Sequence, residues 1–515
     1  MKNILLILML IVPVIANGQA SISWIQNTNG VSLAVDNSNN VFTINNQTFP
    51  GGDIYLTKRN SGGTQLWQAH YDNTDSTKFE KAVYVETDNG GNAIVIGTIS
   101  GLAATTGGNG GIVMKFDPSG NLLWRNVFEN TSPGTYTKKC IIDASNNIYI
   151  LYGSMGNTLG NSLKVRKYSP EGAMIWNYTG TSSTSVQIPV NFKFTGDNFI
   201  VVSGRSAASN SNGYLRLDLN GNLIWNITGI ASMTQGDAAG DNSGNTYLVN
   251  SATSSVTGGT SVRKVNSNGT QIGQSNYPLS AQRVEVGSDN MPVIVGMAGS
   301  NTIGTAFAKL NPEGVLQWIN LNATGNLIFM SHAMIKMDNS NSTYLAGSTS
   351  TAMAVCKVNS GGLTSWVIAV PGFGTVSNFM GGMDIGSDNA VYVTGSLTAK
   401  IVQSNLPAPC PIPQNLFTND ITLNSARVNW DLVAGAVRYD ILYRPAISIT
   451  PIRGWEKRSV PGNVNNLVLT SLRCNTLYNW RIRAVCDSLS PIATPNLSEI
   501  QSFRTAACNL DKNIE

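Results

Sequence analysis

One short phrase recurs along this chain of 515 residues: a basic residue, a turn that contains glycine and, nine residues after the basic one, a tryptophan. Seven copies are complete, although the fifth has Gly273 where tryptophan is expected. An eighth copy is split, because Trp24 stands alone near the N-terminus and Lys400 stands alone at the far end. The simplest chain of this kind is a closed ring in which both termini complete one unit. The seven copies span residues 58–67, 115–124, 167–176, 216–225, 264–273, 309–318 and 357–366.

Each copy predicts a β-hairpin, since apolar alternation leads to the basic residue and a second apolar run follows the glycine turn. A second recurring phrase lies upstream of the hairpin, as in residues 142–153 and 385–395. It also reads as strand, turn and strand, with Asp and Asn residues that can bond to their own backbone. The tryptophan positions are 43 to 57 residues apart, as at Trp24, Trp67 and Trp124. Four strands per repeat are therefore expected.

These features predict an all-β, eight-bladed β-propeller, because a lone four-stranded sheet cannot cover its two apolar faces and must stack on others. The strand at residues 21–26 is expected to join the last blade, at about 379–403, and so to close the ring. Seven blades remain an alternative if the Gly273 unit is not a separate blade. We expect the tryptophans to lie between neighbouring blades, with the loosest contact at Gly273.

The two phrases together resemble those of the secreted bacterial β-propeller repeat proteins, over about residues 21–403. They are also distantly similar to the tryptophan-motif propellers of quinoprotein dehydrogenases, although no adjacent cysteine pair is present here to flank a quinone. The resemblance implies a propeller fold. It implies little about activity, because one fold hosts many chemistries.

The first residues look like an export signal. Lys2 is followed by an apolar run over 4–15 and by small residues around Gly18, the pattern of a cleavable secretory signal peptide. We therefore expect a signal peptide at 1–18, a propeller at 19–405 and a bacterial protein that is secreted or held at the cell surface. The run is too short for a mature membrane anchor, so no membrane span is expected.

Composition changes at residues 406–413, a proline-rich stretch that predicts a linker. The strand pattern of residues 411–508 then resembles a fibronectin type III domain, an antiparallel β-sandwich, and residues 509–515 are expected to form a tail. This resemblance implies that Trp430 is the core tryptophan of the second strand and that Tyr478 forms the corner before the sixth. It also implies two disulfides in an oxidising compartment, Cys410–Cys486 and Cys474–Cys508.

The recurring basic residues allow two interpretations. A ring of ammonium groups could hold an anionic polymer, but long aliphatic stems that pack between blades explain the repeat equally well, and we favour packing. Seven tryptophans and eight basic residues form the structural repeat: Trp24, Trp67, Trp124, Trp176, Trp225, Trp318 and Trp366, with Lys58, Lys115, Lys167, Arg216, Lys264, Lys309, Lys357 and Lys400.

Each upstream turn carries an aspartate, such as Asp36 or Asp88. Calcium could bind there, but one carboxylate per turn favours a role in closing the turn. No cofactor is therefore expected, with calcium as the open possibility. The net charge of +4 and the 12% of charged residues give no basic face suited to nucleic acid.

No catalytic, cofactor-binding or metal-ligating set is recognisable, since the two histidines lack partners at metal-ligand spacing and no nucleophile motif is present. The leading hypothesis is a secreted, non-enzymatic recognition, adhesion or scaffold protein that binds an extracellular glycan or protein through loops of the propeller face. The alternative is an extracellular carbohydrate-active enzyme with carboxylates at the axial mouth. The sequence does not indicate an oligomeric state.

Overall fold

The computed structural model contains two compact units, one with residues 20–403 and one with residues 404–515. The predicted signal peptide (1–18), the tail (509–515) and most of the linker (406–413) lie outside the described residues. The described residues are 20–46, 53–72, 79–100, 110–128, 134–154, 162–180, 187–205, 211–231, 236–251, 259–297, 305–321, 330–348, 352–371, 380–403, 412–433, 436–446, 455–485 and 497–508.

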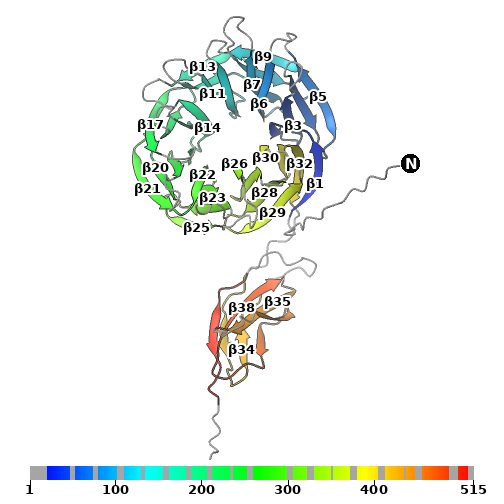
Figure 1. The fold of residues 1–515 in the computed structure, drawn as a ribbon, viewed down its shortest axis with the longest axis vertical. Coiled ribbons are helices and arrows are strands. Elements are labelled where there is room, and N and C mark those ends of the chain that lie inside the picture. The colour runs from blue at the N-terminus through cyan, green and yellow to red at the C-terminus, as the bar shows by residue number, and fades with distance from the viewer. Residues whose placement is uncertain are drawn as a thin grey trace, which may run out of the picture. The chain divides into compact units, whose positions relative to one another are not determined.

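Residues 20–403 form eight four-stranded antiparallel sheets, and Figure 1 shows them one after another around a centre. The innermost strands are β2 (Ser32–Val35), β6 (Phe79–Thr87), β10 (Thr135–Ile142), β14 (Ile188–Phe194), β18 (Asp237–Gly240), β22 (Ser280–Val286), β26 (Met330–Met337) and β30 (Met380–Ile385). The second strands are β3 (Val41–Asn46), β7 (Ala93–Ser100), β11 (Ile148–Ser154), β15 (Ile200–Arg205), β19 (Thr246–Ser251), β23 (Pro292–Met297), β27 (Thr343–Ser348) and β31 (Val391–Gly395).

The third strands carry the recurring basic residues: β4 (Ile54–Arg59), β8 (Gly110–Phe116), β12 (Ser162–Tyr168), β16 (Ser211–Leu217), β20 (Thr260–Val265), β24 (Thr305–Leu310), β28 (Ala352–Val358) and β32 (Leu397–Gln403). The outermost strands carry the tryptophan positions: β5 (Gln65–Tyr71), β9 (Leu122–Phe128), β13 (Met174–Thr179), β17 (Leu223–Ala231), β21 (Gln271–Tyr277), β25 (Leu316–Asn320), β29 (Thr364–Pro371) and β1 (Ala20–Asn27). β1 pairs antiparallel with β32, and Trp24 lies opposite Lys400.

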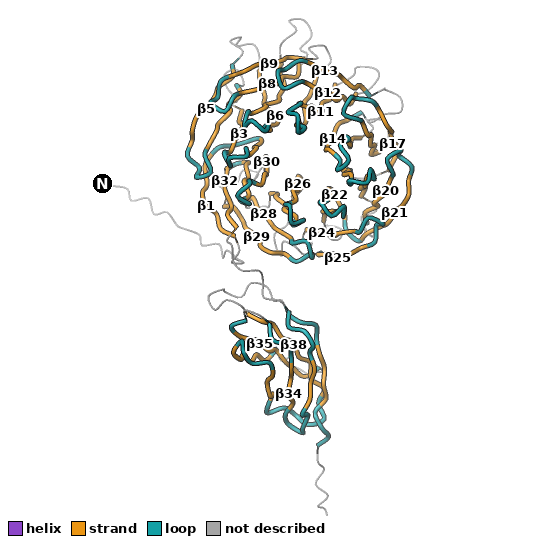
Figure 2. The backbone as a smooth tube through the Cα atoms, turned by 180° about the vertical axis from the view of Figure 1, so that it is seen from behind, coloured by secondary structure: helices purple, strands orange, loops and turns teal. Residues whose placement is uncertain are grey.

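Short polar turns join the first two strands of each sheet. In one of them Asp36 Oδ1 accepts the backbone N–H of Ser38 at 3.0 Å and that of Asn40 at 2.8 Å. Asn39 completes the turn with φ of 61°, a left-handed conformation that asparagine tolerates. The third and fourth strands are joined by turns with a glycine at positive φ, such as Gly120 at 91°. In Figure 2 the tube consists of strands and connections, and the described residues contain no helix.

The core lies between sheets. Phe42 and Leu56 of one sheet pack in a single cluster with Val85 and Val95 of the next, so apolar faces cover one another as a stack of sheets requires. The innermost strands contact each other in chain order, and β30 contacts β2.

The predicted closed β-propeller is wrong. Strand pairing stays within each four-stranded sheet, and among the described residues no sheet closes on itself. Each sheet ends at an outer strand with one unpaired edge, since neighbouring sheets meet through packing and not through a strand ladder. Neither the eight-bladed nor the seven-bladed closed propeller therefore describes this unit. It is an all-β unit of separate four-stranded antiparallel sheets, and the Gly273 repeat supplies a full sheet, β18–β21.

The second unit pairs β33 (Phe417–Asn419), β34 (Ala426–Asn429) and β37 (Asn466–Leu469) in a three-stranded sheet. A four-stranded sheet has the order β36 (Glu456–Pro461), β35 (Arg438–Pro445), β38 (Leu477–Val485) and β39 (Gln501–Arg504). Their core includes Trp430, Tyr439 and Trp480. In the part of the chain that the structure describes, no helix is long and apolar enough to cross a membrane.

Candidate functional site

The recurring tryptophans lie between neighbouring sheets. The Trp67 indole donates from Nε1 to the carbonyl of Pro118 in the next sheet, at 2.9 Å. It also packs against Gly120, where a Cβ atom would come within 2.9 Å of the ring. Trp24, Trp124, Trp176 and Trp318 repeat this arrangement with Gly63, Gly172, Gly221 and Gly362.

The other two tryptophans vary the arrangement. Trp225 packs on Gly269, but its buried Nε1 has no hydrogen-bond partner in the structure. Trp366 is 1% exposed and lies 6.0 Å from the ring of Tyr344, measured between ring centroids.

The contact at Gly273 lacks the indole. The nearest atom to a Cβ built there is Cβ of Lys264, at 3.7 Å. On the facing sheet, Gly314 meets only Ser275 and Tyr277, at 3.5 and 3.9 Å, and the Tyr277 hydroxyl donates to the Gly314 carbonyl. This contact is therefore more open than those that contain tryptophan.

The recurring basic side chains are mostly buried and bridge adjacent sheets. Lys115 Nζ lies 2.9 Å from Asp88 Oδ2 in its own sheet and donates to the Pro170 carbonyl of the next, at 3.1 Å. These contacts are those of a packing role and not of a ring of free ammonium groups. Related ion pairs join Lys58, Lys167, Arg216, Lys309, Lys357 and Lys400 to Asp36, Asp143, Asp197, Asp289, Asp338 and Asp388, while Lys264 lies over the ring of Tyr247 at 5.9 Å.

The turn aspartates thus accept hydrogen bonds within the turn and also form ion pairs with the recurring basic residues. Burial alone would raise the pKa of Asp88, but hydrogen bonds from Lys115 and Asn92 lower it. Among the described residues, no group of three or more His, Cys, Asp or Glu side chains is placed to hold a metal ion.

Charged side chains recur on seven of the eight innermost strands. We call Glu86, Lys139, Lys193, Asp237, Glu285, Lys336 and Asp384 the inner charged cluster. They come from seven different sheets and balance almost exactly in sign, with four acidic and three basic members. Mixed charge at the centre of a repeat unit makes this cluster the candidate functional site.

Lys193 lies at the middle of one half of the cluster. Its ammonium is 2.8 Å from Asp237 Oδ2, 2.9 Å from Glu285 Oε1 and 2.5 Å from the Val284 carbonyl. Burial alone would lower the pKa of Lys193, but Asp237 and Glu285 raise it. The three donors of the ammonium are thus all used.

The other half contains Lys336, Asp384 and Glu86. Lys336 Nζ lies 3.0 Å from Asp384 Oδ1, and the attraction of this carboxylate raises the lysine pKa. Burial raises the pKa of Glu86 and the charge of Asp384 adds to the shift, while Lys336 opposes it. Burial also lowers the pKa of Lys139 to about 8, and its ammonium donates to Asn191 Oδ1 at 3.0 Å.

A cavity of about 250 Å³ opens beside Lys193. Three neighbouring sheets line it with Phe194 and Thr195, with Asn242, and with Glu285 and Ser288. Its walls also include glycines that let the turns approach closely: a Cβ at Gly240 would lie 2.4 Å from the Thr195 side chain.

Sequence reasoning missed the inner charged cluster, although a signal exists. Five members of the cluster stand two residues before the turn that joins the first two strands of their sheet: Glu86, Lys193, Glu285, Lys336 and Asp384. Lys139 and Asp237 stand four residues before it. A charge two or four residues before this turn, on the first strand of a repeat, therefore marks the site.

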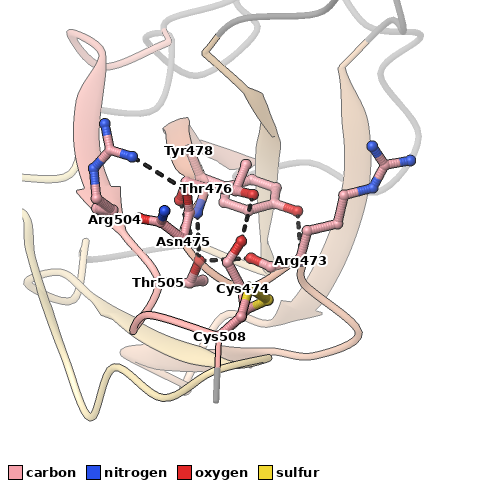
Figure 3. Close-up of a disulfide and its surroundings, with 8 residues drawn as sticks. All are labelled: Arg473, Cys474, Asn475, Thr476, Tyr478, Arg504, Thr505 and Cys508. Atoms are coloured by element: carbon pink, nitrogen blue, oxygen red, sulfur yellow. Dashed lines mark hydrogen bonds between the residues drawn. A yellow bond between two sulfur atoms is a disulfide. The ribbon is translucent and has the colours of Figure 1, made fainter. Parts of the chain in front are cut away.

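Figure 3 shows the disulfide of the second unit, Cys474–Cys508, with Cα atoms 5.1 Å apart. This prediction is confirmed, whereas Cys410 and Cys486 lie outside the described residues. Beside it, the backbone N–H of Arg473 donates to the Tyr478 hydroxyl at 3.0 Å, which forms the expected corner.

A buried aspartate fixes the four-stranded sheet of this unit. Asp440 is fully buried and accepts hydrogen bonds from Arg483 at 2.7 Å and Ser459 at 2.7 Å. Burial alone would raise its pKa, but these bonds and the Lys457 ammonium lower it to about 2.

Three solved structures are similar: one titled "Myokine structure", a redesigned β-sandwich protein, and the fn3 domain of human contactin 1. Their identities to this chain are 20%, 20% and 18%, with TM-scores of 0.16, 0.17 and 0.19. The alignments cover 19%, 21% and 22% of this chain and 99%, 100% and 91% of the other chains, so they do not bear on the chain as a whole.

No curated protein matches the chain, and the resemblance of residues 21–403 to secreted bacterial repeat proteins stays a prediction. The second unit is different, because its sequence matches a family model directly. Residues 411–495 match the model of the fibronectin type III domain, and the chain therefore carries a domain of this family, which is typical of extracellular proteins.

Proposed function

We propose that this chain is an exported, non-enzymatic recognition or scaffold protein that binds a glycan or another protein outside the cell. The fibronectin type III domain at residues 411–495 carries the proposal, because domains of this family often serve binding or adhesion. The proposed location is the medium or the cell surface of a bacterium, reached through the predicted signal peptide.

The inner charged cluster favours recognition over catalysis. Lys193 is held between Asp237 and Glu285, so neither carboxylate is an isolated base. A charge-balanced cluster suits a site that orients polar groups.

One observation favours the second candidate, a carbohydrate-active enzyme. Burial and the charge of Asp384 raise the pKa of Glu86, and glycosidases use a pair of carboxyl groups of which one has a raised pKa. Under this alternative, Glu86 would be the general acid.

A glycan array paired with a hydrolysis assay separates the two candidates. The full mature chain is applied to both, and Glu86→Gln serves as the comparison variant. Recognition predicts binding without release of reducing sugar, and binding that Glu86→Gln leaves unchanged. Turnover that falls at least a hundredfold in Glu86→Gln would establish the enzyme and contradict the recognition proposal.

A further inference from the structure

The cavity beside Lys193 has the chemistry of a site for a hydroxyl-rich ligand. Ser288 and Asn242 bring a hydroxyl and an amide to its wall, and both residues are exposed. The Ser288 hydroxyl donates to Asn341 Oδ1 at 3.1 Å and keeps its lone pairs for a ligand donor. Glu285 adds a carboxylate with a side chain that is 26% exposed, so hydroxyl groups of a ligand have several acceptors within one small space.

The charges around the cavity select against an anion. An anionic ligand needs a free cationic donor, but the ammonium of Lys193 already has three acceptors: Asp237, Glu285 and the Val284 carbonyl. An anion would also face the Glu285 carboxylate across the cavity. A neutral ligand avoids both penalties, because it can donate to Glu285 without displacing Lys193.

The cavity also has an apolar side. Ala239 of the β18 sheet and Val286 of the β22 sheet line it. Phe194 also lines it, but its phenyl ring lies against Tyr149 of the preceding sheet, at 5.4 Å between ring centroids. A ligand with both hydroxyl groups and C–H surface fits such a wall, since apolar side chains cover the C–H surface while polar groups bind the hydroxyls.

Size limits the ligand to one small ring. The volume of about 250 Å³ lies just below the range of roughly 300–1,000 Å³ that accepts drug-sized ligands. It equals about eight water molecules at roughly 30 Å³ each. A single sugar unit is of this order, whereas a disaccharide would have to extend beyond the cavity.

We propose that the cavity between β14, β18 and β22 binds one neutral sugar unit, with Asn242, Glu285 and Ser288 as hydrogen-bonding groups and Ala239 and Val286 as the apolar side. This inference rests on the glycan branch of the proposed function and names the part of the glycan that is recognised. The rest of a longer glycan would lie outside the cavity.

The test uses the full mature chain and ligand-observed NMR with methyl glycosides of neutral hexoses, N-acetylhexosamines and hexuronic acids at millimolar concentration. We expect binding of at least one neutral glycoside and at least tenfold weaker binding of the matching uronate. The variants Asn242→Leu and Ser288→Leu place apolar groups at the cavity wall and should each weaken binding at least tenfold.

The chain offers a matched control. Ser288 and Ser387 occupy the same place in two identical Gly-Ser-Asp-Asn turns, and both donate to an asparagine of a neighbouring turn at 3.1 Å. Ser387 does not line the cavity. Ser387→Leu should therefore bind the glycoside like the unaltered chain, and circular dichroism should show the same fold in both serine variants.

The outcomes are distinguishable from those of the proposed function. Equal weakening by Ser288→Leu and Ser387→Leu, or a uronate that binds as well as the neutral glycoside, would overturn the cavity assignment. A positive glycan array that Ser288→Leu leaves unchanged would also overturn it, while recognition itself would stand. No binding to any array glycan or glycoside would overturn the cavity site and the glycan branch together.

Discussion

The outer and inner strands of residues 20–403 use opposite chemistry for the same task of joining one sheet to the next. On the outside, an indole packs on a glycine of the next sheet and donates to a carbonyl, as Trp67 does with Gly120 and Pro118. On the inside, ammonium groups and carboxylates meet across sheets, as Lys193 and Asp237 do. The outer contact recurs with little change, whereas the inner contact differs at every sheet. The repeated contacts of the outer strands therefore stack the sheets, whereas each ion pair of the inner strands occurs only once among the described residues.

The largest expected effect comes from removing the most buried indole of the outer contacts. Trp366→Ala should lower the free energy of unfolding of residues 20–403 by about 3–5 kcal/mol, the usual cost of truncating a buried aromatic residue. Denaturation followed by circular dichroism measures the loss. Leu66→Ala is the control, because Leu66 is half exposed on an outer strand and should change stability by less than about 0.5 kcal/mol. Similar losses for both variants would refute the role of the outer contact.

Substitution of two glycines separates the cost of backbone strain from the cost of a clash with the indole. Gly120→Ala combines a positive φ of 91° with a clash against Trp67, and we expect a loss of about 3 kcal/mol. Gly314 also has a positive φ, of 82°, but no atom lies closer than 3.5 Å to its Cβ position, so Gly314→Ala should cost only about 1–2 kcal/mol. Chemical denaturation of both variants gives the difference. Equal losses would mean that the indole contributes nothing at the contact.

Restoring the missing indole should make the open contact like the others. Gly273→Trp is expected to stabilise residues 20–403 by about 1 kcal/mol, since it removes a glycine from a strand and fills an open space. The Pro312 carbonyl, which now accepts from Tyr247 at 3.2 Å, is the acceptor equivalent to Pro170. Gly273→Ala is the control and should give only the backbone part of the gain. If Gly273→Trp lowers the stability, Tyr277 already fills this space.

The inner contact should respond to pH. The pKa of Lys139 is about 8 in the folded protein, below the usual lysine value of roughly 10.4 in an unfolded chain. Between these values the unfolded chain binds the extra proton, so Lys139 should contribute a gain in stability of about 1.6 kcal/mol between pH 8 and pH 9.5. The buried thiols of Cys140 and Cys356 have raised pKa values and lower stability over the same range, so the contribution of Lys139 is measured against a variant that keeps both thiols. Lys193 and Lys336 have raised pKa values and add nothing in this window.

The matching variant is Lys139→Met, which removes the titrating group. From pH 8 to pH 9.5 the free energy of unfolding of the unaltered chain should increase relative to that of this variant, as measured by chemical denaturation at each pH. Tyr84 has a raised pKa through burial and would reduce stability only above about pH 10, which is why the window stops short of that value. A difference between the two proteins that stays constant over this range would contradict the assignment to Lys139. Trp366→Ala should keep the same pH dependence at a lower overall stability.

Much of the local structure was readable from the sequence because its causes are local. Glycines after the basic residues and Asx residues after the first strands determine tight turns, and strand alternation follows from the apolar pattern between them. The turn at Asp36 and the glycine at Gly120 have the backbone that these residue types favour. In the second unit the strand pattern led to the fibronectin type III domain, and the Cys474–Cys508 disulfide followed from that topology.

The arrangement of the sheets was harder to predict from the sequence. The closed β-propeller was inferred from the count of repeats and from the split eighth copy, but strand pairing ends within each four-stranded sheet. A repeat count reports how many units exist, whereas hydrogen bonding between units depends on how edge strands meet in space.

The sequence by itself determined the all-β class, the turns and the residues that recur at each outer contact, because these depend on neighbours within a few residues or on a fixed repeat. Tertiary structure alone decided that Lys193 meets Asp237 and Glu285, which lie 44 and 92 residues away. The cavity beside them is likewise built from three sheets. The reason is physical: an ion pair between strands from different sheets has no local pattern, and its stability depends on burial and distance that exist only after the sheets have packed.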